Sequence, residues 1–174
     1  MYKKLICFSF ILTLIFTVKA RSQDEDAMMP PPAVFNEVYD AMDGNWTSES
    51  SMRGIPMKMD LKVYWDLNHQ FLVLDLRSVG REDASMTYQG KGLFGVDEKG
   101  NPKTWWFDSW GANSVSLGSG VFNDNKLIVT GGNAMVNETR SFLVSGNEMV
   151  MNGKGTVNVD GRIIPFDETI IFRK

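Results

Sequence analysis

Cysteine and histidine are almost absent from this 174-residue sequence, in which each occurs once, as Cys7 and His69. Cys7 lies in an N-terminal apolar run that we expect to be removed. The remaining chain would then hold no disulfide, no thiolate metal site and no cysteine nucleophile. With one histidine and no Gly-x-Ser-x-Gly sequence, the usual acyl-transfer triads also lack their parts. We therefore predict no catalytic residues and no metal site.

Long apolar runs are also scarce, and the chain has one, from Leu5 to Val18. Lys3 and Lys4 precede it, and Val18-Lys19-Ala20 offers small residues around a cleavage point. The run is short for a membrane-spanning helix, which needs about 20 apolar residues, and it matches the apolar region of a secretory signal. We expect residues 1–20 to be a signal peptide and the protein to be periplasmic or secreted, with no membrane span after cleavage.

Positive charge becomes scarcer without this leader. Removing residues 1–20 takes away three of the 18 basic residues and none of the 21 acidic ones, so the formal net charge falls from −3 to −6. Such a protein is repelled by nucleic-acid phosphates, and we expect no nucleic-acid partner.

Residues 21–32 are charged and then proline-rich, which predicts a flexible linker before a single domain at residues 33–174.

Turn-forming clusters recur along the domain. They lie at residues 53–56, 66–68, 80–83, 97–101, 111–113, 123–125, 131–133, 145–147 and 160–161. The intervals, mostly about 8 to 14 residues, hold a strand but not a strand and a crossover helix, so neighbouring strands must be antiparallel. Closure would remove unpaired edges. We predict an all-β fold, a single antiparallel up-and-down β-barrel of about ten strands, with one short amphipathic helix over residues 33–42.

Alternation along the strands predicts which side chains face the interior. Met57, Met59, Leu61, Val63 and Trp65 share one face of their strand, and Lys58, Asp60, Lys62, Tyr64 and Asp66 share the other. The same pattern places two further rows inward: Met86, Tyr88, Gly90, Gly92, Phe94 and Val96, and Met149, Met151, Gly153, Gly155 and Val157. Two glycines in each row favour either sharp barrel curvature or open space inside.

Gly90 to Gly95 also spell Gly-x-Gly-x-x-Gly, the pattern of dinucleotide-binding loops. That pattern requires a helix to begin within it, whereas here the flanking apolar residues alternate at period two. We interpret the segment as a β-strand. Gly90 and Gly92 then hint at room inside the barrel, and Gly95 would bend the strand from the opposite face.

Several short stretches together resemble known families. Gly44-Asn45-Trp46 is similar to the opening of lipocalin-type (calycin) barrels, in which the tryptophan closes the barrel floor against an arginine of the last strand. This resemblance implies a structural pair of Trp46 and Arg173, held by a cation–π contact. Over residues 44–174 the chain resembles the bacterial family called domain of unknown function 1579, itself similar to lipocalin and nitrobindin-like barrels. That resemblance rests on Trp46, Asp66–Leu72, Gly90–Asp97, Trp106–Ser109, Arg140 and Glu168–Arg173.

The second family implies a barrel and supplies no established activity. Its nitrobindin-like relatives hold haem through a histidine. The one histidine here, His69, falls by a predicted turn between two strands. We therefore expect no haem and no other cofactor.

Two charged residues are predicted to face the apolar interior. Arg140 shares its face with Val136, Glu138, Phe142 and Val144, and Glu168 shares its face with Ile164, Phe166, Ile170 and Phe172. Buried charges are rare unless they are paired or used. Arg140 would either anchor the carboxylate or phosphate head of a ligand, oriented by Glu168 and Asp108, or form a structural ion pair.

Aromatic and methionine side chains could form the rest of a site. Trp106 shares a face with Asp108 and, with Tyr88, forms either a wall for a ligand or part of an ordinary aromatic core. The pairs Met57/Met59 and Met149/Met151 could bind Cu(I) or line an adaptable apolar pocket. No histidine or cysteine supports copper, so we favour the pocket.

These features predict an exported barrel that binds a small apolar or amphipathic molecule in its interior. One alternative is a barrel filled by its own side chains, working as a structural or protein-interaction module at the cell surface. Another is an enzyme that uses the Asp108 and Glu168 carboxylates as acid and base.

Overall fold

The computed structural model describes residues 31–174. The predicted signal peptide and residues 21–30 of the predicted linker lie outside the described residues. Residues 33–174 form one unit. Its strands are β1 (Gly44–Ser48), β2 (Ser51–Met52), β3 (Ile55–Asp66), β4 (Phe71–Gly80), β5 (Thr87–Val96), β6 (Pro102–Asp108), β7 (Ser116–Asn123), β8 (Lys126–Gly132), β9 (Val136–Ser145), β10 (Glu148–Val159) and β11 (Arg162–Arg173).

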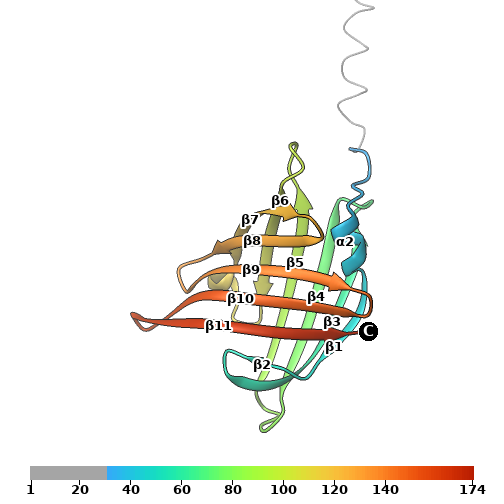
Figure 1. Ribbon diagram of the computed structural model, residues 1–174. Coiled ribbons are helices and arrows are strands. Elements are labelled where there is room, and N and C mark those ends of the chain that lie inside the picture. The colour runs from blue at the N-terminus through green and yellow to red at the C-terminus, as the bar shows by residue number, and fades with distance from the viewer. Residues whose placement is uncertain (1–30) are drawn as a thin grey trace, which may run out of the picture. The chain divides into compact units, whose positions relative to one another are not determined.

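Ten of these strands close into an antiparallel barrel. Each strand from β3 to β10 pairs with the next one along the chain, and β1 closes the ring between β3 and β11. The two-residue β2 adds only to the start of β3. In Figure 1, β8 to β11 cross in front of β3 to β5. The predicted all-β barrel of about ten strands is confirmed.

The connections explain this topology. All nine predicted turn clusters lie between consecutive strands, and the short connections force antiparallel pairing. The unpredicted break falls at Glu49 and Ser50, between β1 and β2. There the Ser50 hydroxyl accepts hydrogen bonds from the Ser48 hydroxyl (2.9 Å) and from the Ile171 N–H (3.4 Å). Such side-chain hydrogen bonds compete with a regular strand ladder.

The short helix α2 spans Glu37–Met42, which is shorter than the predicted 33–42. Its start is set by Asn36, whose side chain accepts hydrogen bonds at 3.1 Å from the N–H groups of Val38 and Tyr39. An asparagine cap satisfies backbone donors that have no partner within the helix. Val38, Tyr39 and Met42 are buried, so the helix packs its apolar face onto the barrel. No helix within residues 31–174 is long and apolar enough to cross a membrane.

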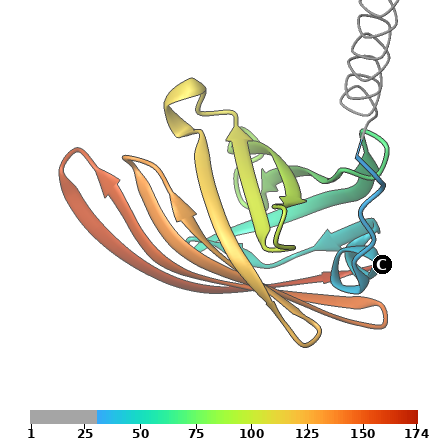
Figure 2. The ribbon, with the colours of Figure 1, turned by 90° about the horizontal axis from the view of Figure 1, so that it is seen from above.

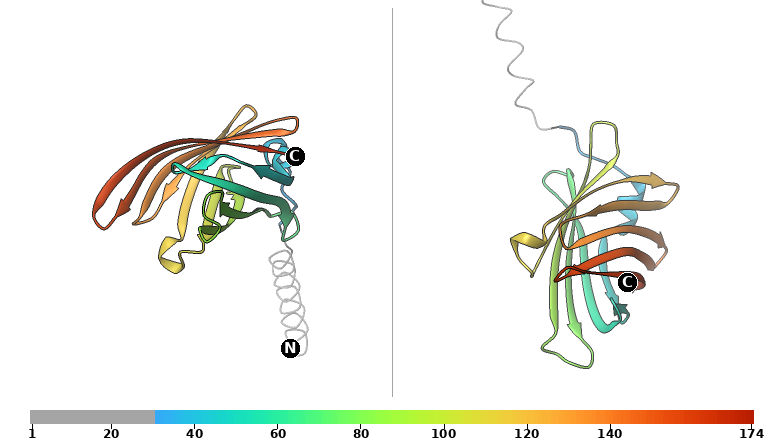
Figure 3. Two further views of the ribbon diagram at one scale, coloured as in Figure 1. Left: turned by 90° about the horizontal axis from the view of Figure 1, so that it is seen from below. Right: turned by 90° about the vertical axis from the view of Figure 1, so that its left-hand side faces the viewer.

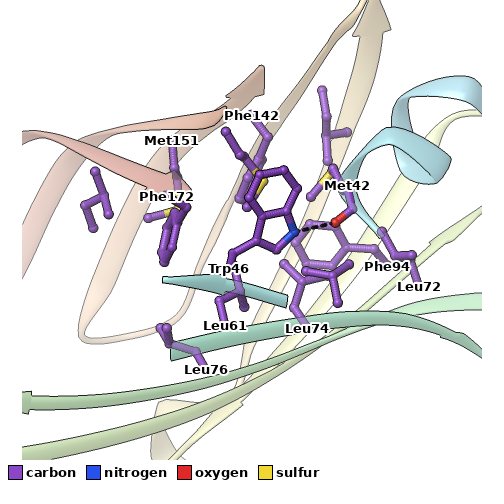
Figure 4. Packing of buried hydrophobic residues seen from close by; sticks show 14 of the residues in the cluster. Met42, Trp46, Leu61, Leu72, Leu74, Leu76, Phe94, Phe142, Met151 and Phe172 are labelled. Atoms are coloured by element: carbon purple, nitrogen blue, oxygen red, sulfur yellow. Dashed lines mark hydrogen bonds between the residues drawn. The ribbon is translucent and has the colours of Figure 1, made fainter. Parts of the chain in front are cut away.

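Trp46 lies in the apolar core near this helix, and 1 % of its surface is exposed. Its indole N–H donates a 2.8 Å hydrogen bond to the Met42 carbonyl, as Figure 4 shows. The cation over the ring is Lys174, with Nζ 4.4 Å from the ring centroid, and not the expected Arg173. Arg173 follows the inward-facing Phe172, so alternation turns it outward, where it pairs with Glu148 at 3.0 Å.

The two ends of the barrel differ. Figure 2 shows α2 and the C-terminus at one end, and the turns at 133–135 and 160–161 with the 3-10 helix Ala112–Ser114 at the other. The up-and-down topology also brings the β2–β3 and β4–β5 connections to this second end. We call it the open end. Figure 3, right, views the barrel from this side.

Candidate functional site

A cavity of about 460 Å³ lies inside the barrel and extends toward the open end, where Arg53, Met86 and Met135 line it. Its volume falls in the range of roughly 300–1,000 Å³ that is typical of small-molecule sites. Most of the deeper wall is apolar, formed by Leu61, Leu74, Leu76, Phe94, Phe142 and Phe172. The charged residues that line it are Arg53, Asp108, Glu138 and Arg140.

Arg140 is held between two carboxylates. Its Nε and Nη2 donate to the two oxygens of Glu138 at 2.7 and 2.9 Å, and Nη2 also donates to Glu168 at 3.2 Å. Burial on its own would lower the pKa of Arg140, but the Glu138 charge and hydrogen bonds, followed by the Glu168 charge, raise it overall. The guanidinium therefore stays charged. The ion pair considered from the sequence, Arg140 with Glu168, is present, but Glu138 makes the shorter contacts.

Glycine makes room for this cluster. Gly153 of β10 pairs in register with Arg140 on one side and Glu168 on the other. A methyl group at Gly153 would lie 3.1 Å from Arg140 Nη1 and 3.3 Å from Glu168 Oε1. The two charged side chains thus meet across a residue that has no side chain.

Glu168 also ties the cluster to the open end. Its Oε2 accepts a 2.7 Å hydrogen bond from the backbone N–H of Arg53, which has a positive φ of 52° in the β2–β3 turn. The Arg53 guanidinium lies over the rings of Phe166 and Trp110, 5.3 and 5.8 Å from their centroids. Glu168 itself is 8 % exposed and does not line the cavity. Its role in the structure is to position Arg140 and this turn.

A second polar group joins β5, β6 and the 3-10 helix. The Trp106 N–H donates to the Tyr88 hydroxyl at 2.9 Å, and that hydroxyl donates to Asp108 at 3.3 Å. Asp108 also accepts hydrogen bonds from the Trp110 N–H at 2.9 Å and from the Ser114 hydroxyl. Burial raises the pKa of Tyr88, so its phenol stays neutral. Asp108 makes none of its hydrogen bonds to Arg140, so the structure separates it from the Arg140–Glu168 pair.

Trp106 occupies the space that Gly90 and Gly92 leave. A methyl group at Gly90 would overlap Trp106 Cζ2, and one at Gly92 would stand 2.9 Å from Cε3. The room that these glycines suggested is therefore filled by an indole, and the cavity lies beyond it. Gly95, expected only to bend its strand, instead lies under the Phe71 ring, with 3.0 Å from the position of a Cβ to Phe71 Cε1.

Only one methionine of each predicted pair lines the cavity. Met57 and Met151 line the cavity, whereas Met59 and Met149 are fully buried in the packed core and do not. Met52, Met86 and Met135 line it as well, and of these only Met86 stood in an inward row predicted from the sequence. Residues 31–174 contain no group of three or more His, Cys, Asp or Glu side chains placed to hold a metal ion.

His69 lies away from the cavity, in the exposed β3–β4 turn. Its ring stacks on Trp65, with 4.9 Å between centroids, and is tilted against Phe35 at 5.6 Å. His69 therefore packs against two aromatic rings and does not line the cavity.

Sequence reasoning placed Glu138 on the face of Arg140 without naming it as a partner, and among the other polar residues that line the cavity it missed Arg53, Ser114 and Asn133. Glu138 carried a usable signal, because it stands two residues before Arg140 and so shares its face. The other three belong to connections, where period-two alternation does not apply.

A comparison of the chain with protein-family models found no match, and a search of curated proteins also found none.

Proposed function

We propose that this protein binds a small apolar or amphipathic molecule inside its barrel. The observation that carries the proposal is the cavity of about 460 Å³, whose deep wall is apolar and whose charged groups gather toward one end. Ligand sites commonly combine an apolar wall with a few polar groups that fix orientation. A barrel filled by its own side chains would not contain such a space. The first 20 residues support export as a further part of this proposal.

We also infer that the chain is related to the family called domain of unknown function 1579 and to lipocalin-like barrels. The closed ten-strand barrel and the placement of Trp46 beside a terminal cation support this relationship. This relationship implies a fold and supplies no activity, so the proposed binding function rests on the cavity alone.

Titration with Nile red, a neutral apolar dye whose fluorescence rises in apolar surroundings, tests the binding function. We expect saturable binding of one dye per chain. A Val136→Trp variant should weaken binding, because Val136 lines the cavity near the open end. The matched control is Ile163→Trp on the exposed part of β11, which should bind as the unmodified protein does. Absence of binding, or an equal loss in both variants, would contradict the proposal.

A further inference from the structure

The Arg140 guanidinium has little capacity left for an anionic ligand. Its Nε–H and both N–H groups of Nη2 point at carboxylate oxygens of Glu138 and Glu168. Nη1 has as its partner the Met151 sulfur at 3.6 Å, a weak acceptor. A ligand carboxylate would therefore have to displace Glu138 or accept hydrogen bonds from Nη1 alone. This argues against the hypothesis, drawn from the sequence, that Arg140 anchors the carboxylate or phosphate head of a ligand.

The charges around the cavity sum to a negative value. Glu138, Glu168 and Arg140 carry two negative charges and one positive charge. Asp108 adds a further carboxylate to the lining, and Arg53 adds the remaining cation. The four lining residues sum to zero, and Glu168, which lies behind Arg140 and does not line the cavity, brings the formal sum over the five residues to −1. In a low-dielectric interior an excess charge of this kind favours a ligand of the opposite sign.

The hydrogen-bonding capacity left on the charged groups adds to this bias. The side chain of Glu138 is 23 % exposed, so its carboxylate borders the cavity even while it pairs with Arg140. The Arg53 guanidinium, in contrast, lies over the rings of Trp110 and Phe166. Glu138 and Asp108 also have partners, but a carboxylate oxygen can accept a second hydrogen bond, whereas the N–H groups of Arg140 that already donate cannot give another.

Aromatic faces near Asp108 add to the same preference. Tyr88, Trp106 and Trp110 all line the cavity, and the Tyr88 hydroxyl joins the Trp106 indole to Asp108. Trp110 donates to Asp108 from its backbone N–H, and its ring lies 6.3 Å from that of Tyr88, with the Arg53 guanidinium over it. The π faces of tyrosine and tryptophan attract ammonium groups, and the attraction is larger where water is excluded. A carboxylate flanked by such rings is a suitable environment for an amine.

We propose that the cavity binds amphipathic molecules whose polar end is a cationic amine, and that it discriminates against molecules that end in a carboxylate. This inference rests on the proposed binding function and specifies the ligand class. The apolar wall would hold the hydrocarbon part. Asp108, Glu138 and the neighbouring rings would receive the ammonium group.

Three probes with the same tail separate the charge preference from binding itself. Decylamine, decanol and decanoate are titrated into the full protein near neutral pH, each below its micelle concentration, by calorimetry. We expect decylamine to bind at least about tenfold more tightly than decanoate, with decanol between them. If decanol binds and decanoate equals or exceeds decylamine, the charge inference fails alone. If none of the three binds, the proposed function fails and the inference fails with it.

Variants identify the groups responsible. Glu138→Gln and Asp108→Asn each remove one carboxylate charge and should reduce the decylamine-to-decanoate affinity ratio severalfold. The control is Asp167→Asn on the outer face of β11, where the carboxylate is 74 % exposed and pairs with Lys154. It should leave the ratio unchanged. An unaltered ratio in both folded cavity variants would overturn the assignment.

Discussion

The indole of Trp106 lies against Gly90, so closely that a methyl group there would overlap Cζ2 and stand 2.8 Å from Cε2. Gly92, on the same face of β5, approaches Cε3 and Cζ3 of the same ring. In register, Gly92 pairs with Trp106 itself, and Gly90 pairs with Asp108. The two glycines thus fit a single side chain that forms part of the cavity wall.

Gly90→Ala should force the Trp106 ring to move and should lower the free energy of unfolding by about 1–3 kcal/mol, the usual cost of overpacking. Urea denaturation followed by circular dichroism measures the change. Gln89→Ala, at the adjacent exposed position, is the control and should change stability little. The penalty should shrink when Gly90→Ala is combined with Trp106→Leu, and additive effects would show that the ring is not the cause.

Sequence alternation placed Gly90, Gly92 and Trp106 on the inner face, and the structure agrees. It did not indicate that they touch, because alternation gives the face of each residue and not its neighbour on the next strand. That neighbour depends on register, which the exact geometry of the turn at residues 97–101 sets. The barrel could be predicted without knowledge of the register. Turn spacing implies antiparallel neighbours, and closure removes the unpaired edges of the sheet.

Arg140→Met should lower the free energy of unfolding by about 3–5 kcal/mol, because Glu138 and Glu168 would remain together without a cation in a partly buried site. Chemical denaturation near neutral pH measures the loss. A loss smaller than about 1 kcal/mol would show that solvent screens this cluster fully.

Arg173→Met supplies the matched comparison. Its partner Glu148 lies at 3.0 Å, but the two side chains are 65 % and 44 % exposed. Exposed ion pairs of this kind contribute about 0–1 kcal/mol. Each arginine pairs with glutamate, but Arg140 is largely buried between two carboxylates and Arg173 is exposed beside one, so Arg140→Met should cost more.

The inward position of Arg140 and Glu168 could be predicted because each lies among apolar residues at even spacing. The closing pair could not be assigned correctly, because the expectation of Arg173 came from family resemblance and not from alternation. Phe172 faces inward, which turns Arg173 outward, and Lys174 then reaches Trp46 from beyond the strand end. The cavity volume also lies beyond sequence reasoning, since it depends on how all inner side chains pack.

Trp46→Phe should lower the free energy of unfolding by about 1–3 kcal/mol, because the Met42 carbonyl would lose its hydrogen-bond donor in a buried site. Lys174→Met should cost less than about 1 kcal/mol, since the cation–π contact is made by an exposed lysine. Thermal unfolding of both variants tests this order. A larger effect from Lys174→Met would mean that the cation, and not the indole hydrogen bond, holds this end of the barrel.

Tyr39 should make the protein sensitive to alkaline pH. Burial raises the pKa of its phenol, whose hydroxyl donates a 3.1 Å hydrogen bond to the Gly95 carbonyl. The unfolded chain therefore loses this proton first, near pH 10, so the stabilisation is complete below about pH 10 and falls by about 1.4 kcal/mol per pH unit above it. Urea denaturation between about pH 8 and 11 should show a shallower decline for Tyr39→Phe than for the unmodified protein. Tyr64→Phe, on the outer face of β3, is the control, and parallel curves for Tyr39→Phe and the unmodified protein would contradict the assignment.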